Sequence, residues 1–375
     1  MSGKHLAFPP GAATFGLVTC QHCLLKPSES LPTAQESFMI RATVDFSSHG
    51  KQTGHIYLPY SYNLAGWANL MLPIAVIRNG PGPTALVMAG NHGDEYPGQV
   101  AVMRLFRELT VDEVQGTLIL IPTLTMPAAK AGTRLSPLDG KNFNRCFPGS
   151  PTGTPCDMLA HYLTTELFPL AEIVVDIHTG GRGVDFYPCA HMHLVPKGVQ
   201  RDQMLVGAEA WNTDFCFLYA DIAGTGLLPV EAENQGKIVI TTEMGGTENV
   251  TAQIHEATQL GLANVLRRFG LLKGAAQTRQ SLGLPATRWV QALSWEDYRF
   301  APESGLFEKI VPLGAKVGEG QTVGAIHFLE RPDREPIAVI SPSEGVLIAN
   351  RGPSLVAQGD CVAVIAHEVD PRRLP

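Results

Sequence analysis

Long apolar runs are missing from this sequence of 375 residues. No stretch reaches the roughly 18 apolar residues that a membrane-spanning helix needs, so we expect no association with a membrane. The first twenty residues contain Pro9 and Pro10 and several glycines, where a secretory signal would carry an unbroken apolar core. The seven cysteines, an odd number without an export signal, predict reduced thiols. These absences together predict a cytoplasmic protein.

Strong charge of one sign is missing as well. Only 17% of the residues are charged, the formal net charge is −7, and the chain has no lysine-rich tail. Proteins that bind nucleic acids usually carry a broad basic surface, so we expect no nucleic-acid partner. A local basic pocket for a small anionic substrate is compatible with this charge. The hydrophobic share of 45% excludes a largely disordered chain.

A regular alternation of strand and helix patterns occupies residues 84–270. Apolar runs predict strands at 84–90, 117–122, 171–178, 213–220 and 237–245. Helical patterns lie between and after them, at 97–109, 156–168, 198–210 and 248–270. This alternation predicts an α/β fold with a mixed, largely parallel central sheet and helices on both of its faces.

The remaining segments suggest the domain boundaries. Residues 1–37 are irregular, because four prolines interrupt any periodicity. Three strand-like runs follow, at 38–46, 54–60 and 72–80. They begin an α/β domain that we place at 38–285. From 286 to 375, short strand-like pieces alternate with Gly, Pro and Asp turns, which predicts a small all-β domain.

The predicted all-β domain contains a weak internal repeat. Residues 302–326 and 342–365 share the order strand, turn, V-x-x-G turn, strand. Two such halves can intertwine into a barrel-sandwich, and the layout resembles biotinyl and lipoyl carrier domains. Those carriers present a lysine at a hairpin tip, whereas the turn between the halves has no lysine here. We therefore expect a covering or oligomer-forming role, and a homo-oligomer is left open.

The segment AGNHGDEYPG, residues 89–98, joins a predicted buried strand to a helix. Ligands bind at the carboxyl ends of strands in open α/β sheets, and His92 and Glu95 lie at such an end. An imidazole and a carboxylate three residues apart can converge on one metal ion. A polar turn with a helix-capping carboxylate explains the same pattern.

The run EIVVDIHTGG, residues 172–181, supplies a third candidate ligand. Strand alternation puts Asp176 and His178 on the same side of a strand that ends there. A strand-end histidine with an ordinary hydrogen-bond partner is the alternative. Two histidines and one glutamate form a conventional catalytic zinc set with one open position. We therefore predict one Zn²⁺ per chain, held by His92, Glu95 and His178.

Glu243 ends another suitable strand, in VITTEMGG. A water molecule on such a metal needs a proton acceptor, and this carboxylate could take the proton and return it to a leaving amine. A hydrogen-bonded acid at a strand end is the alternative role. Glu231 and Glu233 are rivals, but the sequence places them in a more polar loop.

Residues 131–153 form a long segment without helical or strand periodicity, and it carries Arg134, Asn144 and Arg145. The guanidinium group offers a planar fork of donors to a carboxylate and stays charged at neutral pH. One arginine could stabilise a developing oxyanion, and another could hold a substrate carboxylate. A structural loop with its own salt links is the alternative. Two further segments, 181–196 and 219–235, are expected to be loops that shape the cleft.

Two other groups are incomplete as motifs. Cys20 and Cys23 form a CxxC, but a second pair for a structural zinc site is missing and the segment is irregular. His191 and His193 could line the cleft or lie on a strand face. We expect no direct zinc role for them, because three ligands are already assigned.

Four motifs in this order resemble the succinylglutamate desuccinylase/aspartoacylase family, which belongs to the zinc carboxypeptidase-like superfamily: NHGDE, RLSPLDGKNFNRCFPG, DIHTGG and TTEMGG. Within the family, the chain looks closest to bacterial deacylases. The resemblance implies a zinc carboxypeptidase-like catalytic domain whose C-terminal β domain covers the mouth of the active site. It also implies a role for each candidate residue. His92, Glu95 and His178 would bind zinc, and Glu243 would act as general base and acid. Arg134 would stabilise the oxyanion, and Asn144 and Arg145 would bind a carboxylate of the substrate.

The expected function is therefore that of a zinc-dependent amidohydrolase. It would remove a small acyl group, with acetyl as the expected one, from the nitrogen of a small N-acyl amino acid. A metallocarboxypeptidase that acts on short peptides is the rival enzyme. A non-catalytic binding protein that retains the fold is the rival of a different class.

Overall fold

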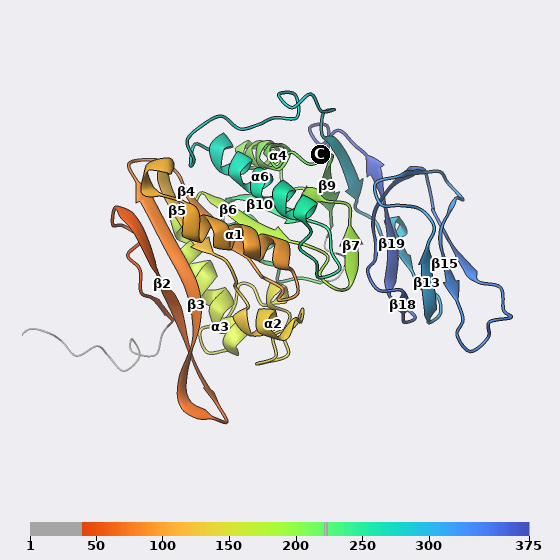
Figure 1. Ribbon diagram of the computed structural model, residues 1–375, viewed down its shortest axis with the longest axis horizontal. Helices are drawn as coiled ribbons and strands as arrows, with labels where there is room; N and C mark the ends of the chain where they lie inside the picture. Colours follow the sequence, from red (N-terminus) through yellow and green to blue (C-terminus); the bar gives the residue numbers. More distant parts are fainter. Residues whose placement is uncertain (1–39, 221, 223, 375) are drawn as a thin grey trace, which may run out of the picture. The chain divides into compact units, whose positions relative to one another are not determined.

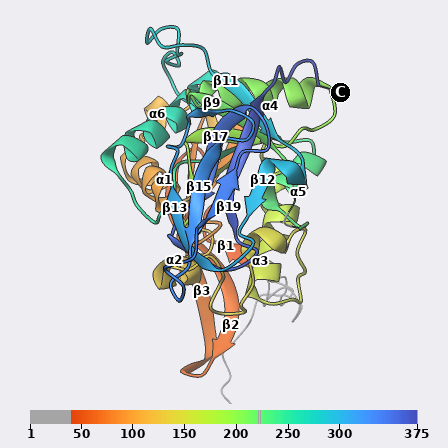
Figure 2. The same cartoon turned by 90° about the vertical axis from the view of Figure 1, so that its right-hand side faces the viewer.

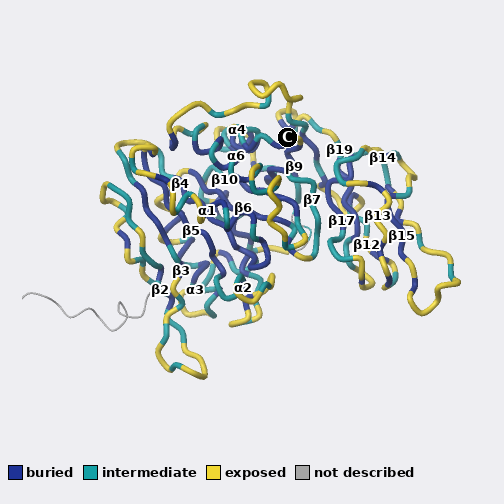
Figure 3. Tube along the Cα trace, viewed as in Figure 1, coloured by how far each residue is buried: buried dark blue, intermediate teal, exposed yellow. Residues whose placement is uncertain are grey.

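Buried parallel strands form the centre of the computed structural model, which describes residues 40–220, 222 and 224–374 (Figure 1). Four strands pair in parallel in the order β5-β4-β6-β10. They are β4 (Thr84–Ala89), β5 (Gly116–Ile121), β6 (Ile173–His178) and β10 (Ile238–Glu243). Nearly all of their residues are buried (Figure 3), because helices or loops cover both faces and only apolar side chains suit such strands. Their carboxyl ends lie at one edge of the sheet.

The sheet continues past β10 with a change of direction. Strand β8 (Cys189–Met192) is antiparallel to β10, and β9 (Phe215–Tyr219) is parallel to β8. Strand β11 (Arg288–Ala292) then pairs in parallel with β9. The predicted mixed, mostly parallel sheet is confirmed.

Beyond β5, the sheet continues laterally with antiparallel strands. Strand β3 (Ala65–Asn79) pairs with β5, then β2 (Gly50–Tyr62) pairs with β3, and β1 (Arg41–Ala42) pairs with β2. The strand predicted at 38–46 is shorter, because the Asp45 side chain accepts a hydrogen bond from the Ser47 backbone at 2.8 Å and forms a turn. Strand β3 begins seven residues before the predicted run, in a stretch that pairs with β2 alone.

Helices lie on both faces of the sheet, with α1 and α6 on one side and α3 and α5 on the other (Figure 2). The helices are α1 (Tyr96–Glu108), α2 (Met126–Ala131), α3 (Pro155–Tyr162), α4 (Val199–Ala210), α5 (Leu228–Asn234) and α6 (Ala252–Arg268). On the first side, Gln259 of α6 donates a hydrogen bond to the Ala101 carbonyl of α1 at 3.0 Å. Across the described ranges, no helix combines the length and apolar character needed to cross a bilayer.

Two segments predicted as loops contain regular structure. Residues 181–196 include β7 (Val184–Phe186) and β8, and residues 219–235 include α5. These elements are too short to show a periodic pattern, and Pro229 in the first turn of α5 resembles a loop signal in the sequence. Residues 1–37, with Cys20 and Cys23, lie outside the described residues.

The strands that follow β11 are antiparallel. They are β12 (Tyr298–Phe300), β13 (Gly305–Lys309), β14 (Lys316–Val317), β15 (Thr322–His327), β16 (Ile337–Ile340), β17 (Gly345–Arg351), β18 (Leu355–Val356) and β19 (Cys361–Glu368). Strand β19 pairs with β11 and so joins the large sheet, whereas β16, β15, β13 and β18 form a separate sheet. Phe307, Ile326 and Leu347 come from both sheets and share one apolar core.

Candidate metal centre and active site

Two predicted ligands lie in the short loop between β4 and α1. Gly93 packs against α2 so closely that a Cβ atom there would lie 2.1 Å from the Ala128 carbonyl carbon, so only glycine fits beside His92. Glu95 occupies the N-cap position of α1, but its side chain makes no capping hydrogen bond. The helix-capping explanation of this motif is therefore wrong. The carboxylate turns away from the helix end and toward the edge of the sheet.

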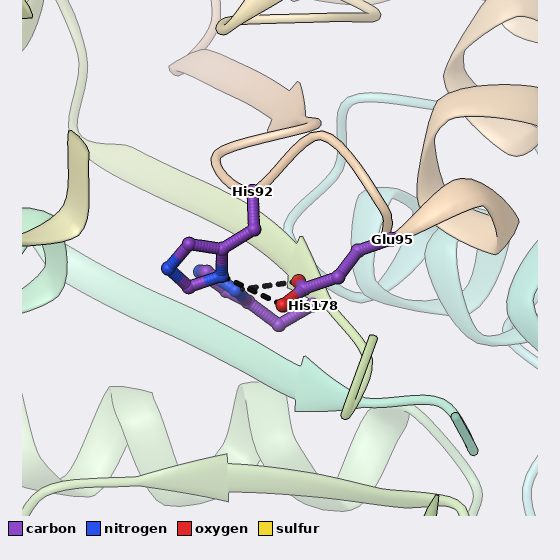
Figure 4. A group of neighbouring side chains, drawn as sticks. All are labelled: His92, Glu95 and His178. Atoms are coloured by element: carbon purple, nitrogen blue, oxygen red, sulfur yellow. Dashed lines mark hydrogen bonds and ion pairs between the residues drawn. The ribbon is translucent and has the colours of Figure 1, made fainter. Parts of the chain in front are cut away.

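The Glu95 carboxylate lies between two imidazole rings (Figure 4). His92 Nδ1 is 2.6 Å from Oε1, and His178 Nδ1, at the end of β6, is 2.9 Å from Oε2. One ligand atom from each of the three residues lies within 4.8 Å of the others, and all three residues are buried. Residues 86 positions apart in the chain therefore meet in a cluster that could hold a metal ion.

The outer nitrogen of each ring is held by a second group. His178 Nε2 is 2.8 Å from Asp176 Oδ2, and His92 Nε2 is 3.1 Å from Asn142 Oδ1. Histidines that bind metals usually engage a carboxylate or carbonyl with the other ring nitrogen, which fixes the tautomer and the ring orientation. Both rings therefore offer Nδ1 to the centre, and two imidazoles with one carboxylate suit zinc. Neither Asp176 nor Asn142 is among the predicted site residues, although strand alternation places Asp176 beside His178.

Charge inside the cluster favours an ionised Glu95. Burial opposes its ionisation, but the rings of His92 and His178 hold the pKa of Glu95 well below its ordinary value. Burial lowers the pKa of His92. Burial also opposes the charge on His178, yet the carboxylates of Asp176 and Glu95 raise the pKa of His178 well above its ordinary value. An anionic Glu95 is the form that a metal ion requires.

Glu243 lies at the end of β10, in register with His178 on β6. Its Oε2 atom is shielded from solvent and has no hydrogen-bond partner among the described residues. Burial, followed by the negative charge of Glu95, raises the pKa of Glu243 to about 8. A carboxyl group with a pKa near neutrality can both accept and donate a proton. The unpartnered oxygen argues against the alternative role of a hydrogen-bonded strand-end acid.

One cavity of about 180 Å³ brings together all the predicted site residues: His92, Glu95, Arg134, Asn144, Arg145, His178 and Glu243. Its other lining residues include His191, Tyr219 and Tyr298, which are not among the predicted site residues. The volume is below the range for drug-sized ligands, so the cavity suits a single small substrate. Glu231 and Glu233 are absent from the described lining of this cavity.

The segment 131–153 reaches the cavity at two points. Arg134 Nη1 lies 3.2 Å from His92 Nδ1 and 3.5 Å from Glu95 Oε1, and its side chain is 47% exposed. Asn144 is buried, and its Oδ1 accepts a hydrogen bond from the Leu228 backbone at 2.8 Å, which fixes the start of α5. Arg145 Nη1 donates to the Asn144 carbonyl at 2.6 Å. Asn144 therefore has a structural contact in addition to its predicted role with substrate.

Asp139 ties this segment to α3, and its loss is expected to destabilise the protein. Its Oδ2 accepts a hydrogen bond from the Cys156 backbone, in the first turn of α3, at 2.9 Å. Burial raises the pKa of Asp139, but hydrogen bonds led by that from the Cys156 backbone outweigh burial and lower it. The stabilisation is therefore present above the unfolded pKa and is lost as the pH falls through the lowered folded pKa.

We expect Asp139→Asn to reduce stability by about 1 kcal/mol at pH 7, because a partly exposed carboxylate at a helix start is screened by solvent. Thermal unfolding of both proteins between pH 7 and pH 3 measures the effect. The difference between the two proteins should shrink as the pH falls. A difference that stays constant over this range would show that the charge on Asp139 is unimportant.

Residues 81–269 match the sequence model of the succinylglutamate desuccinylase/aspartoacylase catalytic domain. This span runs from the start of β4 to the end of α6 and contains every predicted site residue. The chain therefore belongs to the succinylglutamate desuccinylase/aspartoacylase family, as the four motifs predict.

Particular relatives cover nearly the whole chain. N-alpha-acetyl-L-2,4-diaminobutyric acid deacetylase of Halomonas elongata is 37% identical over 90% of this chain and 98% of its own length. The product-bound structure of the ectoine utilization protein EutE (DoeB) from Ruegeria pomeroyi is 34% identical, with a TM-score of 0.83, over 88% of this chain and 99% of that one. A succinylglutamate desuccinylase/aspartoacylase structure from Rhodobacter sphaeroides is 37% identical, with a TM-score of 0.84, over the same shares of the two chains. The predicted likeness to bacterial deacylases is confirmed.

Proposed function

We propose that this protein is a zinc-dependent hydrolase that removes a small acyl group, acetyl in the first place, from the nitrogen of an amino-acid-like substrate. The observation that carries this proposal is the meeting of His92, Glu95 and His178 in the cavity that is also lined by Glu243, whose Oε2 atom has no hydrogen-bond partner among the described residues. The similarity to the Halomonas elongata deacetylase supports acetylated 2,4-diaminobutyrate as a substrate to test first.

His92, Glu95 and His178 would hold the zinc ion, one per chain. When bound, zinc polarises the amide carbonyl and lowers the pKa of a water molecule toward 7. The outer hydrogen bonds to Asp176 and Asn142 keep the two rings in place for this task.

Glu243 transfers the protons. Its carboxylate takes a proton from the attacking water as the new C–O bond forms. The protonated Glu243 then donates that proton to the amide nitrogen as the C–N bond breaks, so that the amine leaves neutral. The buried position of its Oε2 atom supports this role, because the atom has no competing hydrogen bond among the described residues.

Arg134 stabilises the negative charge that develops on the carbonyl oxygen. Its Nη1 atom lies within 3.5 Å of the Glu95 carboxylate, at the predicted reaction centre. A fixed cation in a partly enclosed site lowers the energy of an oxyanion without a large reorganisation of solvent.

Arg145, with Asn144, binds the carboxylate of the substrate and so selects amino-acid derivatives. We expect Arg145→Ala to raise the KM for an N-acetyl amino acid by about 10–100-fold, since a hydrogen bond to a charged group contributes about 1.5–3 kcal/mol. Steady-state kinetics of both proteins measure the change. The control substrate is the matching N-acetyl amino acid amide, which has no carboxylate. An equal rise in the KM for both substrates would contradict the role of Arg145 in binding the carboxylate.

We propose residues 38–285 as the catalytic domain and 286–375 as a barrel-sandwich domain that covers the mouth of the cavity. The shared core of Phe307, Ile326 and Leu347 between the two antiparallel sheets supports the sandwich arrangement. Tyr298 of β12, which lines the cavity, supports the covering role.

A panel assay with the zinc-loaded protein tests the proposed function. The panel contains N-acetyl and N-succinyl forms of several amino acids, together with unblocked dipeptides and tripeptides. We expect turnover of N-acetyl amino acids and none of the peptides. Preferential cleavage of unblocked peptides would instead identify a metallocarboxypeptidase, and binding without turnover across the panel would indicate a binding protein.

A further inference from the structure

Cys146 and Cys156 are two free cysteines next to the active site, and the proposed chemistry does not use them. Cys146 directly follows the short 3-10 helix Phe143–Arg145, and Cys156 lies in the first turn of α3. Their thiols lie within hydrogen-bonding distance of each other. Cys146 is partly exposed, whereas Cys156 is only 5% exposed. Two thiols from different elements therefore meet, and one of them is open to solvent.

A neighbouring oxygen holds each thiol in place. The Cys146 thiol donates a hydrogen bond to the Asn142 carbonyl oxygen at 3.3 Å, and the Cys156 thiol donates to Asp139 Oδ1 at 3.2 Å. The Cys156 backbone N–H donates to the other oxygen of the same carboxylate at 2.9 Å. These contacts keep both sulfur atoms between the active-site segment and the start of α3.

The two thiols differ in acidity. A hydrogen bond from Cys156 lowers the pKa of the Cys146 thiol, and the Lys141 cation adds to this effect, although burial and the charge of Asp157 oppose it. The same hydrogen bond, followed by burial, raises the pKa of Cys156. Because the thiolate is the nucleophile, Cys146 is the thiol that attacks an oxidant, and Cys156 is the thiol that resolves the product.

A second pair of neighbouring cysteines lacks this reactivity. Cys189 lies on β8 and Cys216 on β9, in strands that pair with each other, and both residues have 0% exposure. Burial raises the pKa of each of these thiols well above its ordinary value. Such thiols stay protonated and out of reach of an oxidant. Among the described cysteines, the pair of Cys146 and Cys156 is therefore the one suited to oxidation.

Cys146 is connected to the active site through two neighbours. Arg145 precedes it in the chain and lines the cavity. Asn142, whose carbonyl oxygen accepts the hydrogen bond from Cys146, also positions His92 through the 3.1 Å contact between Oδ1 and Nε2. Oxidation to a disulfide would remove the hydrogen that Cys146 donates to Asn142 and would tie Cys146 to α3. The backbone beside Arg145 would then follow the new link.

We propose that Cys146 and Cys156 form an oxidation site at which hydrogen peroxide produces a reversible disulfide, and that this link lowers turnover at the neighbouring active site. The effect on turnover rests on the proposed deacylase function, whereas the formation of the disulfide does not. A disulfide of this kind, made transiently in a protein whose thiols are otherwise reduced, is typical of redox sensing.

The reaction takes two steps. The Cys146 thiolate attacks one oxygen of the peroxide, the O–O bond breaks, and Cys146 becomes a sulfenic acid while hydroxide leaves and takes up the proton that Cys146 lost. The Cys156 sulfur then attacks the Cys146 sulfur, the S–O bond breaks, and the hydroxyl group leaves as water with the Cys156 proton. Two thiols are thus oxidised as one peroxide is reduced to two water molecules, and a dithiol reductant reverses the change.

Mass spectrometry tests the oxidation site without turnover. The zinc-loaded full chain is treated with hydrogen peroxide, and the remaining free thiols are blocked with N-ethylmaleimide. Cleavage after lysine and arginine gives the peptide 146–182, which contains Cys146 and Cys156 and no other cysteine. We expect this peptide to lose two hydrogen atoms and take up no blocking group, and a dithiol to restore both thiols. Two blocked thiols, or further oxidation of Cys146 without a link, would overturn the proposal.

Steady-state kinetics with N-acetyl-2,4-diaminobutyrate measure the consequence for the active site. We expect oxidation to lower kcat/KM by about 10-fold or more, because a small displacement of positioning groups costs this much, and reduction to restore it. Cys156→Ser keeps a donor for Asp139, so it should retain the activity of the reduced protein and lose the response to peroxide. Cys146→Ser is the second variant with the same expected result. Cys361→Ser removes a partly exposed cysteine of β19 and should respond as the wild type does.

The outcomes separate the two proposals. A wild type that forms the disulfide and keeps its kcat/KM, or serine variants that lose activity on oxidation as the wild type does, would overturn the control of turnover and leave the deacylase proposal intact. A disulfide in a protein that hydrolyses no N-acyl amino acid in either state would contradict the proposed function and support the oxidation site.

Discussion

Glu243→Gln is expected to lower kcat by about 10²–10⁴-fold while the protein keeps its metal. The amide has nearly the same shape as the carboxylate but can neither take a proton from water nor return one to the leaving nitrogen. Because Glu243 is not one of the three clustered ligand residues, metal content should stay unchanged. Steady-state kinetics and metal analysis on the same preparation measure both quantities.

Glu231→Gln is the matched control for this experiment. Glu231 is a nearby carboxylate on α5 that accepts a hydrogen bond from Gln235 at 3.0 Å and is absent from the described lining of the cavity. Its substitution should leave kcat within about twofold, as is usual for a group outside the reaction. Full activity in Glu243→Gln, or equal losses in the two variants, would remove Glu243 from the mechanism.

The double substitution His92→Ala/His178→Ala is expected to abolish both metal binding and turnover. Wild-type protein should contain about one zinc ion per chain, and the variant almost none. Bound metal also stabilises the folded state, by about 4 kcal/mol at a thousandfold excess over the dissociation constant. A chelator should therefore lower the Tm of the wild type and leave that of the variant unchanged. Metal analysis and thermal unfolding with and without chelator measure these effects.

His327→Ala serves as the control for the loss of a histidine. His327 pairs with Glu308 on the separate β16-β15-β13-β18 sheet, at 2.9 Å, and its side chain is 48% exposed. This variant should retain the metal content and the response to chelator of the wild type. Zinc that persists undiminished in the double variant would show that the cluster is not the metal site.

The meeting of His92, Glu95 and His178 could be predicted from the sequence because their positions follow from simple rules. Buried parallel strands are visible as short apolar runs, and the carboxyl ends of such strands meet at one edge of a sheet. His92, His178 and Glu243 each follow or end such a run, so the amino-acid order is enough to predict that they lie close together. The structure adds the detail that Glu95 lies between the two rings and caps no helix.

Arg134, Asn144 and Arg145 could also be predicted, and they line the same cavity. The positions of its other lining residues could not be predicted, and His191 could only be left open as a cleft residue, because these positions depend on pairings that leave no local pattern. Strand β8 has only four residues and enters the sheet antiparallel to β10, which brings His191 opposite Thr241. Tyr298 comes from β12, more than fifty residues beyond Glu243. Asn142 reaches His92 from an irregular segment. No periodicity in the sequence connects these residues, so only tertiary structure places them.

Strand β11 is hydrogen-bonded on one side to β9 and on the other to β19. If the C-terminal strands moved as a hinged lid, the backbone hydrogen bonds of β11 to β9 or to β19 would have to break, because these strands belong to the same sheet as the strands that line the cavity. Rigid-body gating of the kind found in enzymes with separately hinged lobes is thus disfavoured in this molecule. We therefore expect the passage of substrate and product to depend on side chains and loops that line the cavity, Tyr298 among them, and not on a movement of the C-terminal strands as a body.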